Sequence, residues 1–241
     1  ELLLQDRDVA RSVSLGGSCN RCELSGRNLT GATFTGATFI SATLVGSDLR
    51  GAELIGSNFT GSDFTRANLR GVEILGANFA EANFSNASLA GAEAQGSSFV
   101  RSNLSRADLS GAELHGVNFN GATLAGANLS DSELFGATLA NVKAAGANFA
   151  GSELNASNLS NGDFTGAIFS GAVSARMVGT PPLPPDWPCR PRQARAPVTQ
   201  RARTLRPAPT DTRRLRLRGR SRERTRSSAS LGANSAALGS G

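Results

Sequence analysis

The chain repeats every five residues over most of its length. The unit is clear in residues 32–36 (ATFTG), 67–71 (ANLRG) and 147–151 (ANFAG), where Leu or Phe holds the centre. A small residue, usually Ala or Ser, stands two places before the centre, and Gly commonly ends the unit. The 155 residues from Cys22 to Arg176 divide into 31 such units without a break in register. A period so short, sustained for so long, leaves few folds open.

This period excludes ordinary helices and strands. An amphipathic helix needs apolar residues about every 3.6 residues, and a half-buried strand needs them at every second residue. Gly in every fifth position would also cost a helix about 1 kcal/mol each time. The pattern instead favours a chain that turns a corner once per unit, with the small and large residues facing inward and Gly at the bend. Units that bury nothing alone must stack on their neighbours, so we expect a solenoid.

Glutamate carries a second, longer period. Of the seven glutamates directly before a unit centre, six recur at every twentieth position: Glu53, Glu73, Glu93, Glu113, Glu133 and Glu153. Twenty is four units of five, so this period predicts four units per coil and places the six glutamates on one side. At a strand spacing of about 4.8 Å, just under eight coils would make a rod roughly 37 Å long.

The same period sorts the unit centres into columns. One side receives a column of phenylalanines, and another receives a column of leucines. The members are Phe39, Phe59, Phe79, Phe99 and Phe119, and Leu29, Leu49, Leu69, Leu89, Leu109 and Leu129. We expect both columns to be core. Ala94 and Ala144 replace large centres, which predicts a locally thin interior.

The A-(D/N)-L-x-x rhythm resembles the pentapeptide-repeat family. The resemblance covers about 155 residues, and the opening GSCNRCELSGRNLTGATF at 17–34 resembles the Cys-x-x-Cys lead-in of such solenoids. It implies an all-β fold, a right-handed quadrilateral parallel β-helix. We therefore expect a poorly defined lead-in at 1–16, the pentapeptide-repeat β-helix at 17–176, and a disordered Arg/Pro-rich C-terminal tail at 177–241.

Charge divides the chain into an acidic body and a basic tail. Residues 22–175 carry 13 acidic and 7 basic residues, whereas residues 176–241 carry 15 Arg and 3 acidic residues. A basic disordered arm could bind nucleic acid or anionic surfaces through phosphate contacts. A frameshift is a second explanation of the tail, because codons for Arg213-Arg214-Leu215 read one base later give Ala-Asp-Leu or Ala-Asp-Phe. Resequencing the gene tests that hypothesis.

Three interpretations of the glutamate strip remain open: a solvated edge, a partner-facing acidic surface, and a metal site. Like charges on neighbouring strands repel each other, so the recurrence of glutamate on one side needs an explanation. Outward apolar residues beside charge suit an interface. The partner-facing candidates are Glu93, Glu113, Asp131, Glu133, Glu153, Ile55, Leu75 and Phe135. Arg50 and Arg70 precede Glu53 and Glu73 by three residues and are expected to neutralise them.

Cys19 and Cys22 both fall in inward register, so we expect a cap buried on the first coil. A disulfide and metal or redox chemistry remain alternatives, although zinc would need two more ligands. His115, the one histidine, is interpreted as a surface residue. No constellation for general acid–base or nucleophilic work is evident, so we expect no enzyme, no cofactor and no metal.

The leading functional hypothesis is a non-enzymatic scaffold that presents the acidic strip to a protein partner. The resemblance implies an alternative, since some members of the family are acidic dimeric rods that bind DNA gyrase. The third hypothesis is nucleic-acid or anionic-surface binding through the tail, which deletion of residues 177–241 would test. No run is long and apolar enough for a membrane span. We expect a cytoplasmic bacterial protein by default, or a secreted or periplasmic one if a signal peptide preceded Glu1.

Overall fold

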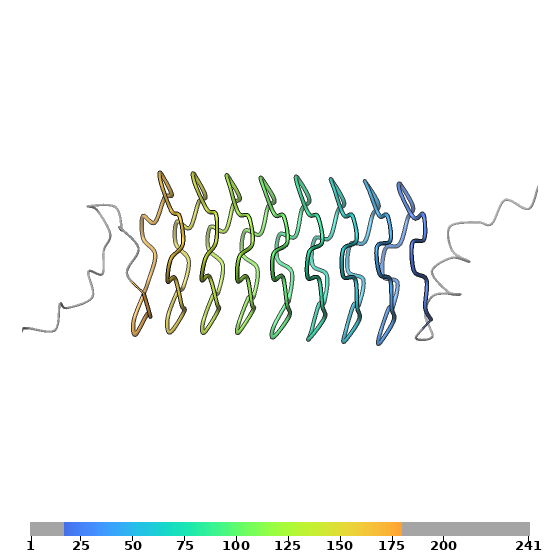
Figure 1. The fold of residues 1–241 in the computed structure, drawn as a ribbon, viewed down its shortest axis with the longest axis horizontal. Helices are drawn as coiled ribbons and strands as arrows, with labels where there is room; N and C mark the ends of the chain where they lie inside the picture. The colour runs from blue at the N-terminus through green and yellow to red at the C-terminus, as the bar shows by residue number, and fades with distance from the viewer. Residues whose placement is uncertain (1–16, 180–241) are drawn as a thin grey trace, which may run out of the picture. The chain divides into compact units, whose positions relative to one another are not determined.

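The computed structural model describes residues 17–179, which wind into one stack of coils (Figure 1). Parallel bridges join each residue before a centre to its equivalent four units later, from Ser18 with Thr38 to Asn158 with Val178. One coil therefore holds four units of five, as the spacing of the glutamates predicts. Each side of a coil contributes a single bridging residue, so the described part has no helix and no longer strand. Nothing in this range could therefore cross a membrane as a helix.

Backbone hydrogen bonds hold each unit in two directions. In the unit centred on Phe34, the Phe34 N–H donates to the Glu53 carbonyl at 2.7 Å, and the Gly36 N–H donates to the Ile55 carbonyl at 2.9 Å. The Ala37 N–H turns back to the Phe34 carbonyl at 3.0 Å and closes the corner. The same pattern recurs along the stack, so the coils on either side satisfy the backbone of the coil between them.

The corner residue of each unit has a positive φ. From residue 21 to residue 176, Gly holds 20 of the 32 corners, among them Gly76 with φ 62°. Twelve corners hold other residues, such as Arg66 with φ 57° and Ala156 with φ 58°. A left-handed conformation costs a residue with a Cβ roughly 1–2 kcal/mol. The stacked coils must therefore hold these corners in place.

The unit centres form the interior, and both predicted columns are confirmed. The rings from Phe39 to Phe119 stack with centroids 5.0 to 5.5 Å apart and planes within 25° of parallel. The leucines from Leu29 to Leu129 are at most 1% exposed. Several inner serines bond the carbonyl of the preceding centre, as where the Ser47 hydroxyl donates to the Leu44 carbonyl at 2.7 Å. Ala94 and Ala144 are as buried as the large centres, and the thin interior around them stays a prediction.

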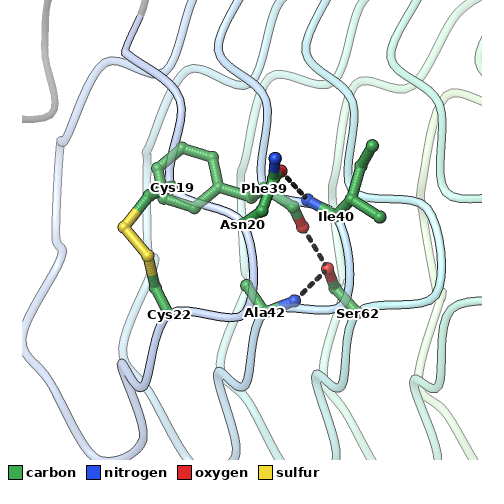
Figure 2. Close-up of a disulfide and its surroundings, with 7 residues drawn as sticks. All are labelled: Cys19, Asn20, Cys22, Phe39, Ile40, Ala42 and Ser62. Carbon is green, nitrogen blue, oxygen red and sulfur yellow. Dashed lines mark hydrogen bonds between the residues drawn. A yellow bond between two sulfur atoms is a disulfide. The ribbon is translucent and has the colours of Figure 1, made fainter.

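Cys19 and Cys22 close the N-terminal end of the described stack (Figure 2). Both are half-buried, pack against the core, and form a disulfide with each other. The sequence favours a cap with buried side chains, and the structure shows the cap in its disulfide state with only partial burial. The reason is the corner between them: Arg21 turns the chain with φ 58° and brings the two Cα atoms to 5.6 Å, within disulfide range.

Val178 forms the last bridge, two residues past the predicted end of the solenoid at Arg176. The lead-in at 1–16 lies outside the described residues, as does the tail from residue 180 onward. The predictions about tail disorder, the frameshift and nucleic-acid binding therefore stay predictions.

Candidate protein-interaction face

One side of the stack carries the six predicted glutamates, and we call it the glutamate face. Parallel bridges join Glu53 to Glu73 and continue coil by coil as far as Glu153. Each glutamate precedes a buried centre, so its side chain points outward while the next residue enters the core. The residues two places after the glutamates form a second column on this face: Ile55, Leu75, Gln95, His115, Phe135 and Asn155.

Exposure divides the face into two halves. Glu53 and Glu73 are half-buried, whereas Glu93, Glu113, Glu133 and Glu153 are exposed. Ile55 and Leu75 are also half-buried, so the prediction that they are exposed apolar residues is wrong. They follow one another in the same column, one coil step of about 4.8 Å apart, so each can shield part of the other. Phe135 differs from both, because 57% of its surface is exposed.

Polar residues of the second column reach glutamates of the next coil. The Gln95 side-chain amide donates to Glu113 Oε2 at 2.7 Å. His115 Nε2 lies 2.8 Å from Glu133 Oε2, and the two side chains are 41% and 50% exposed. In each pair the two residues are 18 apart in sequence, which is one coil of twenty residues minus the two-residue offset between the columns. His115 is thus a surface residue, as expected, although it has a titratable partner that the sequence analysis missed.

Phe135 occupies the next place in this column and cannot donate a hydrogen bond. Its ring lies edge-on to His115, with centroids 6.5 Å apart and planes at 83°. A hydrogen-bond donor at position 135 would reach Glu153 of the next coil. Within residues 17–179, Glu153 forms no ion pair and no side-chain hydrogen bond. Asp131 lies at the corner before Glu133, exposed and with φ 56°. The structure therefore gathers Asp131, Glu133, Phe135 and Glu153 on one exposed stretch.

The expected neutralisation of Glu53 by Arg50 is wrong. Arg50 Nη2 lies 2.7 Å from Asp48 Oδ2, and its Nε donates to Asp48 Oδ1 at 2.9 Å. These two residues lie on the same side of one coil, whereas Glu53 lies beyond the corner at Gly51. Hydrogen bonding to Arg50 is the largest cause that lowers the pKa of Asp48. Arg70 likewise forms no ion pair with Glu73 in the part of the chain that is described.

The sequence analysis also missed three exposed apolar residues on the last coil. Ile168, Val173 and Val178 hold bridge positions that are polar in the coils before them. The signal was available, because sorting the residues before each centre by the coil period places an apolar side chain last in three columns.

Comparison with family models places most of the solenoid within known repeats. The family described as pentapeptide repeats matches residues 18–54, 47–86 and 132–171, and the pentapeptide repeat region matches 75–149. The chain belongs to the pentapeptide-repeat family. Its stack is accordingly a right-handed β-helix type of fold, four units to the coil. The comparison with curated proteins found no significant match.

Several solved pentapeptide-repeat structures are similar to this chain. Trypsin-treated QnrB1, a plasmid-mediated fluoroquinolone resistance protein, is 23% identical over 67% of this chain and 85% of its own, with a TM-score of 0.47. HetL of Nostoc sp. strain PCC 7120, involved in heterocyst differentiation regulation, is 25% identical over 69% and 91%, with a TM-score of 0.33. A protein from the Arabidopsis thaliana thylakoid lumen is 26% identical over 55% and 71%, with a TM-score of 0.24.

Proposed function

We propose that this chain is a non-enzymatic scaffold whose glutamate face, from Glu93 to Glu153, binds a protein partner. The observation that carries the proposal is Phe135, a large aromatic side chain left 57% exposed among acidic neighbours. Gln95 and His115 show that a polar residue in this column hydrogen-bonds the next glutamate. A merely solvated edge would gain from such a residue at position 135. Phe135 cannot make that hydrogen bond, and it exposes apolar surface instead.

An exposed aromatic residue with charged neighbours has the composition of a binding hot spot. Aromatic anchors at the centre of an interface supply much of the affinity, while surrounding charges steer the partner and set specificity. The partner should therefore offer an apolar pocket for Phe135 with basic residues around it. The proposed contact residues are Glu93, Glu113, Asp131, Glu133, Phe135 and Glu153. Ile55 and Leu75 are left at the margin because they are half-buried.

The absence of catalysis is part of the proposal. Within residues 17–179, no three His, Cys, Asp or Glu side chains are grouped so that they could hold a metal ion. The His115–Glu133 pair is the nearest approach to an acid–base couple, and it lies on an open surface with His115 41% exposed. General acid–base chemistry also needs a substrate held within hydrogen-bond reach, which an open face does not provide.

Site-specific photo-crosslinking tests the proposed face. A benzophenone amino acid is placed at position 135, and in a matched control at the exposed Ala145 on another side of the stack. We expect position 135 to give a discrete protein adduct in the native host, and Ala145 to give none. Glu133→Gln with Glu153→Gln should weaken the adduct. Equal crosslinking from both positions, or an adduct that ignores the glutamate changes, would refute the proposal.

DNA gyrase is an alternative partner, suggested by the family resemblance and favoured by the repeating acidic charge. The ladder places one carboxylate per coil, about every 4.8 Å, against one phosphate about every 3.4 Å along a DNA strand. The strip is thus less densely charged than the DNA it would imitate. A supercoiling assay with the chain lacking residues 190–241 tests this alternative, because that truncation removes the basic tail and keeps Val178, the last bridging residue. Unchanged gyrase activity at micromolar protein would eliminate gyrase and leave the scaffold proposal standing.

A further inference from the structure

Three sides of the last described coil present an apolar side chain on the outside. Ile168, Val173 and Val178, here called the terminal apolar triad, are 51%, 50% and 59% exposed. In the preceding coil the same three columns hold Asn148, Glu153 and Asn158. The change from polar to β-branched apolar residues thus occurs on three sides within one coil. A coil whose sides only face water would gain nothing from this change to apolar residues.

The backbone fixes the triad in this outward position. The N–H groups of Ile168, Val173 and Val178 donate to carbonyls of the preceding coil at 2.9, 2.9 and 3.0 Å. Because the coil backbone is bonded at these residues, their side chains cannot rotate into the core. Only another group packed from outside can bury them.

Within residues 17–179, the column of large centres on one side also stops at this coil. Ser174 takes the centre position in a column whose earlier members include Leu114, Leu134 and Leu154. Its hydroxyl is enclosed and has no hydrogen-bond partner among the described residues. The last coil is therefore an incomplete layer, and the ends of repeat solenoids normally need a cap.

We propose that residues 180–189 of the same chain (TPPLPPDWPC) form this cap, with Trp187 covering Val173 and Val178. The segment follows directly from Gly179 at this end of the stack, and its one charged residue is Asp186. It cannot build another regular coil. If the five-residue register continued, Pro182 and Pro184 would stand where typical units use an N–H donor, and proline has none.

The segment is long enough to reach the triad. Trp187 is eight residues after Gly179 in the sequence, so the two can lie up to about 28 Å apart. One side of a coil, five residues long, spans at most about 17 Å. Trp187 can therefore cross a whole side and lie over Val173 and Val178. By covering the last coil, the cap also keeps its open edge from pairing with a second molecule.

Intrinsic fluorescence reports on this cap alone, because the chain has one Trp and no Tyr. The full chain is used, with Cys189→Ser to prevent intermolecular disulfides. We expect acrylamide to quench Trp187 several-fold less efficiently than free N-acetyltryptophanamide, independently of protein concentration. Val173→Lys with Val178→Lys should raise quenching toward the free value. The control Ile40→Lys, at an exposed apolar residue of the second coil, should leave it unchanged.

Val173→Thr with Val178→Thr keeps the β-branched shape, so it tests the same contact if the lysines unfold the last coil. Quenching like that of free tryptophan in the unmodified chain would overturn the proposal, and so would protection that survives both pairs of substitutions. If Trp187 is protected only at protein concentrations where light scattering detects a dimer, a second copy of the chain covers the triad. That result would also overturn the proposal.

Discussion

Replacing Phe79 with Ala tests whether the aromatic column is rigid core. Phe79 is fully buried, and its ring lies 5.5 Å from Phe59 and 5.1 Å from Phe99 in the stack. It also meets Phe64 at 5.8 Å and Phe84 at 5.3 Å, edge to face. Phe→Ala in a core costs about 3–5 kcal/mol. Four ring contacts are lost together and bonded coils on both sides resist collapse, so we expect about 4–5 kcal/mol.

Urea unfolding followed by circular dichroism measures this cost, provided that the m-value is unchanged. Phe79→Leu is the matched control, because Leu139 and Leu159 already hold the same column. It should cost only about 1–1.5 kcal/mol, since most of the apolar volume remains. A loss below about 2 kcal/mol for Phe79→Ala, at constant m, would show that the coils collapse around the gap and would refute the rigid-column argument.

Three further outcomes follow from particular residues. Asp48 has a lowered pKa in the folded chain, so its bond to Arg50 stabilises the fold above the ordinary aspartate pKa, and this stabilisation is lost as pH falls through the folded pKa. Asp48→Asn should therefore destabilise slightly at pH 7, and urea unfolding should show no difference once the pH lies below the folded pKa. Cys19→Ser with Cys22→Ser opens only a short loop, so it should cost about 2 kcal/mol and speed amide exchange in the first coil alone. Gly76→Ala meets no atom within 4 Å, so calorimetry should show only the positive-φ cost of about 1 kcal/mol.

Most of the fold can be predicted from the sequence because every five-residue unit has the same pattern of small, large and corner residues. A single Leu or Ala says little about structure, but 31 units in one register predict inward centres, corners and, with the glutamates, the circumference. The bridges between equivalent residues of successive coils and the stacked Phe column match that prediction. The state of Cys19 and Cys22 did not follow, because it depends on the geometry of one non-Gly corner rather than on the repeat.

The candidate face was less predictable, because it depends on how far side chains reach between coils. Counting along the chain placed Arg50 near Glu53, yet Arg50 meets Asp48 across two residues of one side. The sequence separation of His115 and Glu133 has no meaning until the coil length and the two-residue offset are both known. Once they are known, such pairs can be read from sequence, whereas the partial burial of Ile55 still requires coordinates.

The distribution of exposure on the face favours a local protein contact over imitation of DNA. Imitation needs charge that is accessible along the whole rod, but Glu53 and Glu73 are half-buried. The exposed ladder glutamates, Glu93 to Glu153, span three coil steps, about 14 Å. That length suits one patch of a partner better than a length of duplex. Phe135 lies within this stretch rather than beside it. The phosphate backbone of DNA has no group that corresponds to an exposed aromatic side chain. A protein partner with an apolar pocket can bind such a side chain.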